Sequence, residues 1–211
     1  MFRQGLYYIE RVGCEGDDSI NLAHCNWHDH GWSNDADAWP IHDGEQYYAR
    51  GPFQLAWNYN YGRFSNIFYE DDYDSRKILL EYPERVHEDP FTVFSAALWF
   101  YMTPQAPKPS MHDVVTGYFE PNTEDEDVGI MGGFGTTINI INGADECGFP
   151  SVSANNRVEW YEDFLDYFGI SDDEDLDCEE EGDFPAGGAA SVPSYYTESW
   201  TVSGACQVVS W

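Results

Sequence analysis

The sequence predicts a mainly α-helical domain with long loops, and three observations support this fold class. Helix-start signals recur along the chain, as where Asp89 precedes Pro90 at an expected first helical position. The segment FTVFSAALWFYM (91–102) is long and apolar on nearly all sides, which is typical of a buried helix. Strand signals are few. The 211 residues suffice for one sizeable domain with its own core.

The first element is a long loop over residues 11–46, which are polar, rich in Gly and Asp and without periodicity. A disulfide between Cys14 and Cys25 would close part of it. A loop of this length in a compact domain usually covers a functional site or is mobile.

Helices are expected next. The helix after Asp89 is predicted to be central and buried, and Ser110 begins a capping-box pattern that opens a short helix. Within residues 154–168 the apolar positions recur at helical spacing, and Gly169 provides a C-terminal stop. These positions are Val158, Tyr161, Leu165 and Phe168.

The predicted domain boundary follows Cys178. Residues 1–178 form the domain, and residues 179–211 form an acidic and then small-residue linker and tail. The final stretch, YYTESWTVSGACQVVSW, regains apolar character and is either the start of a further module or a strand pair.

The charge excludes some partners. With 39 acidic and 9 basic residues the formal net charge is −30, which repels phosphate backbones and anionic lipids. We therefore expect no nucleic-acid or membrane partner, whereas a neutral polysaccharide remains compatible. The sequence has no apolar run long enough to span a bilayer, and its N-terminus lacks the features of a signal peptide.

Aromatic residues make up 17% of the chain, with 8 Trp and 15 Tyr. Such a surplus suits a sugar-binding cleft, but an aromatic core would show it as well. No cofactor is expected.

Five cysteines leave at least one unpaired. The cluster of His24, Cys25, His28 and His30 matches no standard zinc spacing, so we predict no metal site and interpret it as a polar loop.

Two clusters of amides have the chemistry of a ligand site. Amides, aromatics and an arginine alternate over residues 47–62, and Asn139 and Asn142 lie on an otherwise apolar segment. Amide side chains can donate to and accept from acetamido and hydroxyl groups of a sugar. Each cluster could equally hold backbone groups, because a buried Asn must find partners in either case.

Several motifs resemble those of one enzyme family. YYARGPFQLAWNYNYG (47–62), ALWFYMTPQAPKPSMHDVVTG (97–117), GFGTTINIINGADECG (133–148) and LDC (176–178) are similar to glycoside hydrolase family 19, the chitinases of plants and some bacteria. The resemblance covers roughly residues 5–178 in the family's order. It implies a lysozyme-like bilobal helical fold with a substrate cleft, and hydrolysis of β-1,4-linked N-acetylglucosamine polymers with inversion at the anomeric carbon.

The resemblance also implies site residues, a disulfide between Cys147 and Cys178, and hence an oxidising, extracellular compartment. The family member is expected to be a secreted monomer that binds chitin or chito-oligosaccharides. The implied substrate contacts are Trp39, Tyr47, Gln54, Tyr59, Asn60, Gln105, Lys108, Asn142 and Arg157.

An inverting glycosidase needs a carboxylic acid that protonates the leaving oxygen and a carboxylate that activates water on the other face of the sugar. In the family the acid lies in a His-Glu-Thr-Gly-Gly-like segment, and the base follows shortly in a stretch like Tyr-Ile-x-Glu or Gln-Glu-Arg-Gly. In GLYYIERVG (5–13), the second pattern makes Glu10 the base, whereas the first puts Arg11 in the slot. The base is therefore Glu10, with its register open by one residue.

The chain departs from the family pattern at two further places. The acid's slot falls at Phe2, which cannot donate a proton, and Ala56 stands where many members have a hydroxyl that helps to hold the attacking water. Loss of a general acid typically costs on the order of 10²–10⁴ in rate.

The leading hypothesis is a chitinase-type endo-acting hydrolase whose 211-residue chain, read as truncated at its N-terminus, lacks the general acid. The alternatives are a chito-oligosaccharide-binding pseudoenzyme and, from a third class, an acidic structural or interaction protein that keeps only the fold.

Overall fold

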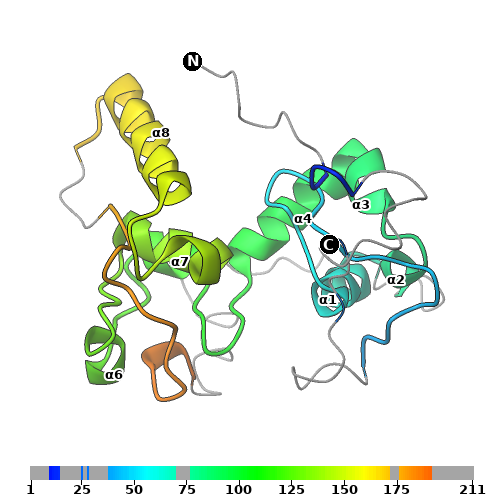
Figure 1. The fold of residues 1–211 in the computed structure, drawn as a ribbon, viewed down its shortest axis with the longest axis horizontal. Coiled ribbons are helices and arrows are strands. Elements are labelled where there is room, and N and C mark those ends of the chain that lie inside the picture. The colour runs from blue at the N-terminus through cyan, green and yellow to red at the C-terminus, as the bar shows by residue number, and fades with distance from the viewer. Residues whose placement is uncertain are drawn as a thin grey trace. The chain divides into compact units, whose positions relative to one another are not determined.

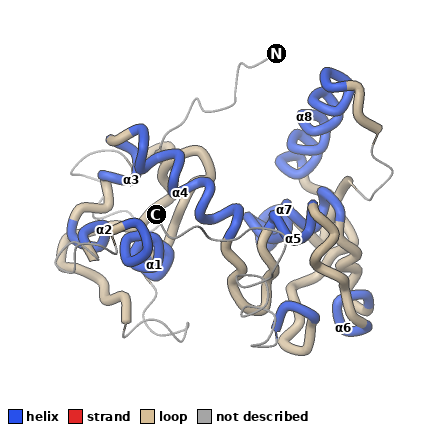
Figure 2. The backbone as a smooth tube through the Cα atoms, turned by 180° about the vertical axis from the view of Figure 1, so that it is seen from behind, coloured by secondary structure: helices blue, strands red, loops and turns tan. Residues whose placement is uncertain are grey.

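The computed structural model describes residues 10–14, 25, 28, 38–69, 77–171 and 176–191. These residues form two compact units, one that ends at Phe100 and one that begins at Tyr101. Figure 2 shows helices and loops but no strand in the described part of the chain, which contains only isolated backbone bridges. The prediction of a mainly helical protein is confirmed.

The first unit contains short helices and most of one long helix (Figure 1). Its elements are α1 (Asn58–Phe68), α2 (Ile78–Glu81), α3 (Arg85–Glu88) and α4 (Pro90–Met102), of which α4 continues past the unit's end. Its core is built around aromatic and aliphatic side chains, and α1 packs against α2. The buried members are Tyr47, Leu55, Tyr61, Phe64, Leu79, Leu80, Val86, Ala96 and Trp99.

Helix α4 begins as the sequence predicts. The Asp89 carboxylate accepts a hydrogen bond from the Thr92 backbone N–H at 2.8 Å, and Pro90 is the first helical residue.

The expectation that α4 is buried all round is wrong. Phe91, Phe94 and Leu98 are 72%, 56% and 64% exposed. They recur at i, i+3 and i+7, so they share one face, while Ala96 and Trp99 face the core. A helix at the edge of a small unit can bury only one face, whatever its composition.

The second unit contains the remaining helices. They are α5 (Met111–Val115), α6 (Thr123–Glu126), α7 (Gly133–Glu146), α8 (Val152–Phe168) and the 3₁₀ turn η4 (Ala189–Ser191). The predicted caps are present: Ser110 accepts from the Asp113 N–H at the start of α5, and Gly169 ends α8 in the left-handed conformation. Phe134 of α7 stacks on Tyr161 of α8 with ring centroids 4.0 Å apart.

Of the four apolar positions predicted on α8, Val158, Tyr161 and Leu165 are half-buried, whereas Phe168 is 66% exposed. The spacing is helical as expected, but α7 covers the beginning of α8 rather than its last turn.

Both predicted disulfides are present. Cys14 bonds to Cys25 beside Tyr48, and Cys147 at the end of α7 bonds to Cys178. Residues 179–191, which we predicted to begin the linker, pack on the second unit: the Gly182 N–H donates to the Val128 carbonyl, and Ala189 N–H donates to the Asp125 carboxylate. The residues after 191, including Cys206, lie outside the described part of the chain.

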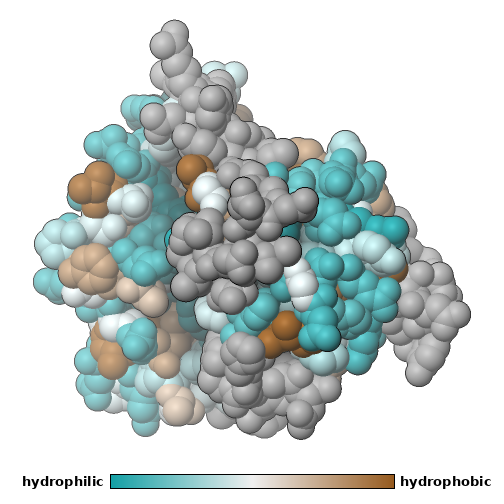
Figure 3. All heavy atoms as spheres, turned by 45° about the vertical axis from the view of Figure 1, so that its right-hand side comes forward, coloured by the Kyte–Doolittle hydropathy of each residue, from teal (hydrophilic) through white to brown (hydrophobic). Residues whose placement is uncertain are grey.

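Hydrophilic residues are prominent on the surface of the described residues (Figure 3). Figure 3 shows that hydrophilic residues dominate the described part of one face, with isolated hydrophobic patches between them.

Candidate active site

The segment that holds Glu10 is fixed by backbone pairing. Glu10 forms an antiparallel bridge with Arg50, and the Arg11 N–H donates to the Ala49 carbonyl at 2.9 Å. Arg50 in turn pairs with Leu55 through two backbone hydrogen bonds of 3.0 and 2.8 Å. The motif RGPFQL (50–55) therefore folds back on itself and presents its first residue to Glu10.

The Glu10 carboxylate lies in a polar cluster. The Tyr48 hydroxyl donates to Glu10 Oε2 at 2.9 Å, and His87 Nε2 lies 3.7 Å from Glu10 Oε1. The Glu10 side chain is 20% exposed, whereas Arg11 is exposed. The structure thus places a partly buried, hydrogen-bonded carboxylate at position 10 and an exposed side chain at position 11.

Arg50 anchors the cluster from the core. It is 5% exposed, its Nη1 donates to the Gln46 carbonyl and to the Tyr61 hydroxyl at 2.9 Å each, and its guanidinium lies 3.7 Å from the centre of the Tyr48 ring. The Tyr61 hydroxyl donates to the Tyr48 carbonyl at 2.7 Å. Burial raises the pKa of Tyr61 to about 12, so this hydroxyl stays protonated.

Burial also determines the protonation state of the His87 ring. It lowers the pKa of the imidazole, and Arg50 lowers it further, while Glu10, Glu88 and Glu84 act in the opposite direction. The net pKa is below the ordinary value of 6.5, so the ring beside Glu10 is neutral at neutral pH.

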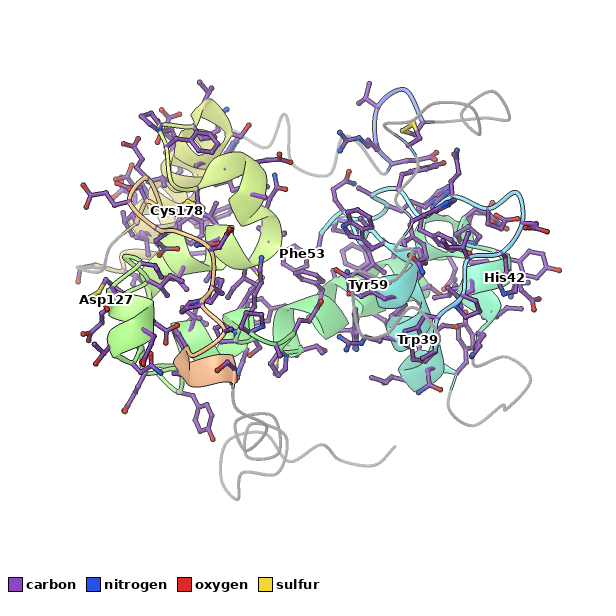
Figure 4. The ribbon with its side chains drawn as sticks, turned by 60° about the horizontal axis from the view of Figure 1, so that its bottom comes forward. Trp39, His42, Phe53, Tyr59, Asp127 and Cys178 are labelled. Atoms are coloured by element: carbon purple, nitrogen blue, oxygen red, sulfur yellow. A yellow bond between two sulfur atoms is a disulfide. The ribbon has the colours of Figure 1, made fainter. Side chains whose placement is uncertain are left out.

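The predicted sugar contacts of the first unit lie on α1 and the segments before it. Figure 4 shows Trp39 and Tyr59 in this unit. The half-buried Trp39 ring rests on Gly62 of α1, where a Cβ would come within 2.6 Å of Trp39 Cδ2, and Lys77 Nζ lies 5.4 Å from the ring centre. Close packing of the ring therefore depends on Gly62.

The polar members of this group differ in their surroundings. Asn60 donates from Nδ2 to the Ala56 carbonyl at 2.9 Å, but its buried Oδ1 has no hydrogen-bond partner. Gln54 donates to the Gly51 carbonyl. Tyr47 is fully buried, and its hydroxyl donates to the Leu80 carbonyl. The open acceptor of Asn60 is typical of a group that completes its hydrogen bonding with a ligand or water.

The predicted contacts of the second unit gather around α7. The Lys108 ammonium donates to the carbonyls of Asn139 and Ile140 at 3.0 and 3.1 Å, just before Asn142, whose φ/ψ of −151°/36° breaks the helix. Burial lowers the pKa of Lys108. Gln105 pairs with Lys108 through two backbone hydrogen bonds.

Asn142 and Arg157 meet at a carboxylate that the sequence reasoning missed. Asn142 Nδ2 donates to Glu146 Oε1 at 2.7 Å, and Arg157 binds the same carboxylate through Nε and Nη2 at 2.7 and 2.9 Å. The spacing of four residues between Asn142 and Glu146 was the signal that could have revealed it, because such residues share a helix face. Burial alone would raise the pKa of Glu146, but these hydrogen bonds lower it.

The other amide, Asn139, holds backbone and side-chain groups. It donates to Glu181 Oε2 and to the Gly182 carbonyl at 2.9 Å each. Of the two alternatives for this cluster, the structural one therefore applies to Asn139.

The histidine cluster gives no metal site in the described residues. Cys25 is used in a disulfide, His28 Nε2 is 2.9 Å from the Glu45 carbonyl oxygen, and no group of three or more His, Cys, Asp or Glu side chains within the described ranges is arranged to hold a metal ion. His24 and His30 lie outside those ranges, as does Phe2.

The family model of glycoside hydrolase family 19, described as chitinase class I, matches residues 15–178. The chain belongs to this family. The resemblance seen in the sequence is thereby confirmed, and the fold is the lysozyme-like fold of the family 19 chitinases.

Two curated relatives and one solved structure illustrate the match. Chitinase 9 of Oryza sativa subsp. japonica is 44% identical over 150 residues, which are 71% of this chain and 43% of the relative. Inactive chitinase-like protein 1 of Hevea brasiliensis is 41% identical over 151 residues, 71% of this chain and 46% of the relative. The chain thus spans less than half the length of these family 19 relatives.

The solved structure is the class IV family 19 chitinase from Zea mays. It superposes with a TM-score of 0.54 at 28% identity and covers 81% of this chain and 64% of its own.

No helix among the described residues is both long and apolar enough to cross a membrane.

Proposed function

We propose that this protein hydrolyses β-1,4 linkages between N-acetylglucosamine units of chitin by an endo-acting, inverting mechanism in which Glu10 is the general base. Family membership supports the reaction class. The observation that carries the assignment of the base is the placement of the Glu10 carboxylate, which is partly exposed and hydrogen-bonded to Tyr48.

In this mechanism Glu10 removes a proton from a water molecule as the water attacks the anomeric carbon from the face opposite the leaving sugar. The carboxylate must be ionised and must keep one lone pair free for that water. Tyr48 occupies one oxygen as a donor, which leaves the other oxygen and its remaining lone pairs for the water.

Substrate binding is assigned to the predicted residues of both units. Trp39 offers an aromatic ring to a pyranose, and the unpartnered Oδ1 of Asn60 accepts from an acetamido N–H. The remaining assigned contacts are Tyr47, Gln54, Tyr59, Gln105, Lys108, Asn142 and Arg157. The two disulfides support a secreted protein that works in an oxidising compartment, and we assign it as a monomer.

One position distinguishes this chain from the family pattern. Phe2 stands where the pattern has the general acid, and its side chain has no acidic proton to donate. We therefore expect that the 211-residue chain cleaves an unactivated glycosidic bond at least about 10²-fold more slowly than a family member with both carboxylates.

A substrate with a good leaving group tests the base separately from the acid. The β-fluoride of N,N′-diacetylchitobiose needs little protonation of its leaving group, so the chain should release fluoride from it readily even though it cleaves chitin hexamer at least about 10²-fold more slowly than a family member with both carboxylates. The fluoride is measured with an ion-selective electrode, and NMR should show that the disaccharide forms first as the α-anomer.

Glu10→Gln and Arg11→Gln form a matched pair for the register. Glu10→Gln should abolish fluoride release, and Arg11→Gln should leave most of it. The opposite pattern would transfer the base position to residue 11, and hexamer cleavage at the rate of other family members would refute the role given to Phe2.

The second candidate function is a chito-oligosaccharide-binding protein without catalysis. Phe2 at the acid position and Ala56 in place of a hydroxyl favour it, and the Hevea relative carries the name of an inactive protein. Binding of chitin hexamer by calorimetry without any release of fluoride from the β-fluoride would select this function.

A further inference from the structure

Glu10 is held on two sides by Tyr48 and His87, which are not among the site residues that the family resemblance implied. Figure 1 draws residues 10–14 in dark blue next to α3, which carries His87. We propose that Tyr48 and His87 are positioning residues that fix the Glu10 carboxylate in its working orientation, with Tyr48 on Oε2 and His87 on Oε1. The proposal deepens the proposed function, because it rests on Glu10 being the base.

Tyr48 can position Glu10 because its own ring is held firmly. The Arg50 guanidinium covers one face of the ring at 3.7 Å, and the Cys14–Cys25 disulfide packs in the same buried cluster. Tyr48 is 5% exposed, so its hydroxyl has little freedom to leave the carboxylate for water. The disulfide also begins four residues after Glu10, which ties the Glu10 segment to the same ring.

His87 restrains the second oxygen. Its side chain is 13% exposed, and its Nε2 lies 3.7 Å from Glu10 Oε1, a contact distance rather than a hydrogen bond. Its Nδ1 is buried without a hydrogen-bond partner, so the polar contact of the ring is the one that Nε2 makes with Glu10. The charged groups that act on the ring are Glu10, Arg50, Glu84 and Glu88.

A neutral ring is suited to this task. A protonated imidazole would form an ion pair with Glu10 and reduce its tendency to accept a proton from water. The neutral ring instead limits the rotation of the carboxylate while leaving its charge for the reaction. Loss of either positioning residue should therefore lower kcat and leave KM nearly unchanged, since a misplaced base affects the transition state and not substrate binding.

The titration of His87 reports this geometry without any need for activity. We would follow the His87 ring by NMR in the wild-type chain, in Glu10→Gln, in Tyr48→Phe and in the double variant. Removal of the carboxylate should lower the pKa of His87, because Glu10 raises it. Tyr48→Phe should lower it in the same direction by less, since the freed carboxylate moves away from the ring.

The double variant should match Glu10→Gln, because Tyr48 acts on the ring only through Glu10. An additive double variant, or a Tyr48→Phe variant with an unchanged His87 titration, would overturn the role of Tyr48. An unchanged titration in Glu10→Gln would overturn the role of His87. Tyr48→Phe keeps the ring under Arg50, so the variant is expected to fold.

Fluoride release from the β-fluoride of N,N′-diacetylchitobiose then tests the consequence for the reaction. Tyr48→Phe and His87→Asn should lower kcat by about tenfold or more with KM within about twofold. Two matched controls should keep wild-type kcat: Tyr82→Phe, which removes an exposed hydroxyl of the same unit, and His112→Asn, whose ring lies at the same 3.7 Å from the Asp113 carboxylate.

The two proposals fail in different ways. A wild-type chain that releases no fluoride overturns the proposed function. The contacts of Tyr48 and His87 with Glu10 would then have no catalytic role, even if the Glu10 and Tyr48 variants change the titration of His87. A wild-type chain that releases fluoride at a rate unaffected by Tyr48→Phe and His87→Asn overturns the positioning roles alone.

Discussion

Arg157 on α8 and Glu146 on α7 are joined by a two-pronged ion pair, with Nε donating to Oε2 at 2.7 Å and Nη2 donating to Oε1 at 2.9 Å. The Glu146 side chain is 5% exposed, whereas that of Arg157 is 41% exposed. The buried partner is the carboxylate, so removal of the arginine leaves a buried charge that, among the described side chains, keeps the hydrogen bond from Asn142.

Arg157→Gln should therefore lower the free energy of unfolding by about 1–3 kcal/mol at pH 7. The folded pKa of Glu146 is below its ordinary value of 4.5, so the stabilisation is fully present above about pH 4.5 and is lost as the pH falls further. Urea unfolding at pH 7 and pH 3 measures this. An equal loss at both values would contradict the role of the ion pair, and Arg85→Gln, at an exposed arginine, serves as the control.

His87 should make stability depend on pH in a different range. Its folded pKa lies below 6.5, so the unfolded chain binds more protons than the folded chain in the window below about pH 6.5. Stability contributed by the neutral ring is complete above that value and falls as the pH drops through it. His87→Asn should flatten the dependence of the melting temperature on pH below about 6.5, and a dependence equal to that of the wild type would contradict this role of the ring.

Trp39→Ala should weaken the binding of chitin hexamer at least about tenfold, because truncation of an aromatic anchor commonly costs about 2 kcal/mol. Isothermal titration calorimetry gives the affinity. Tyr82→Ala, which removes an exposed aromatic of the same unit, should bind like the wild type. Unchanged affinity in Trp39→Ala would remove Trp39 from the site.

Gly62→Ala tests the same ring without altering it. The new Cβ would come within 2.6 Å of Trp39 Cδ2, so the indole must move off α1. We expect weaker hexamer binding, together with a changed Trp fluorescence spectrum. Gly187→Ala, whose Cβ would meet its nearest neighbour at 3.4 Å, is the control. If Gly62→Ala binds the hexamer as tightly as the wild type, the packing of the Trp39 ring on α1 is irrelevant to binding.

Asp125 is predicted to hold the segment after Cys178. It is 1% exposed and accepts hydrogen bonds from the backbone N–H groups of Asn122 and Ala189 at 3.1 and 2.8 Å. Asp125→Ala should cost about 1–2 kcal/mol and increase hydrogen exchange of residues 185–191. Exposed Glu126 provides the control substitution. Unchanged exchange would show that other contacts hold this segment.

Local signals in the sequence were enough for several helix ends. The starts of α4 and α5 and the end of α8 follow from Asp89, Ser110 and Gly169, because capping is decided by residues within one turn. The disulfide of Cys147 with Cys178 followed from the family resemblance, and that of Cys14 with Cys25 from their place in one loop.

The burial of individual side chains could not be predicted from local sequence signals. The composition of α4 suggested a fully buried helix, yet Phe91, Phe94 and Leu98 are exposed, since a face is buried only where another element packs on it. Glu146 and His87 also escaped notice, because Arg157 lies 11 residues from Glu146 along the chain and Glu10 lies 77 residues from His87.

The sequence by itself determined the helical class and the family, because short motifs and local caps encode these properties. It left Glu10 and Arg11 as alternatives for one position. Only the tertiary structure brings Tyr48 and His87, from positions 38 and 77 residues further along the chain, to the Glu10 carboxylate and leaves Arg11 exposed. The orientation of a side chain depends on such distant neighbours, and no local pattern specifies them.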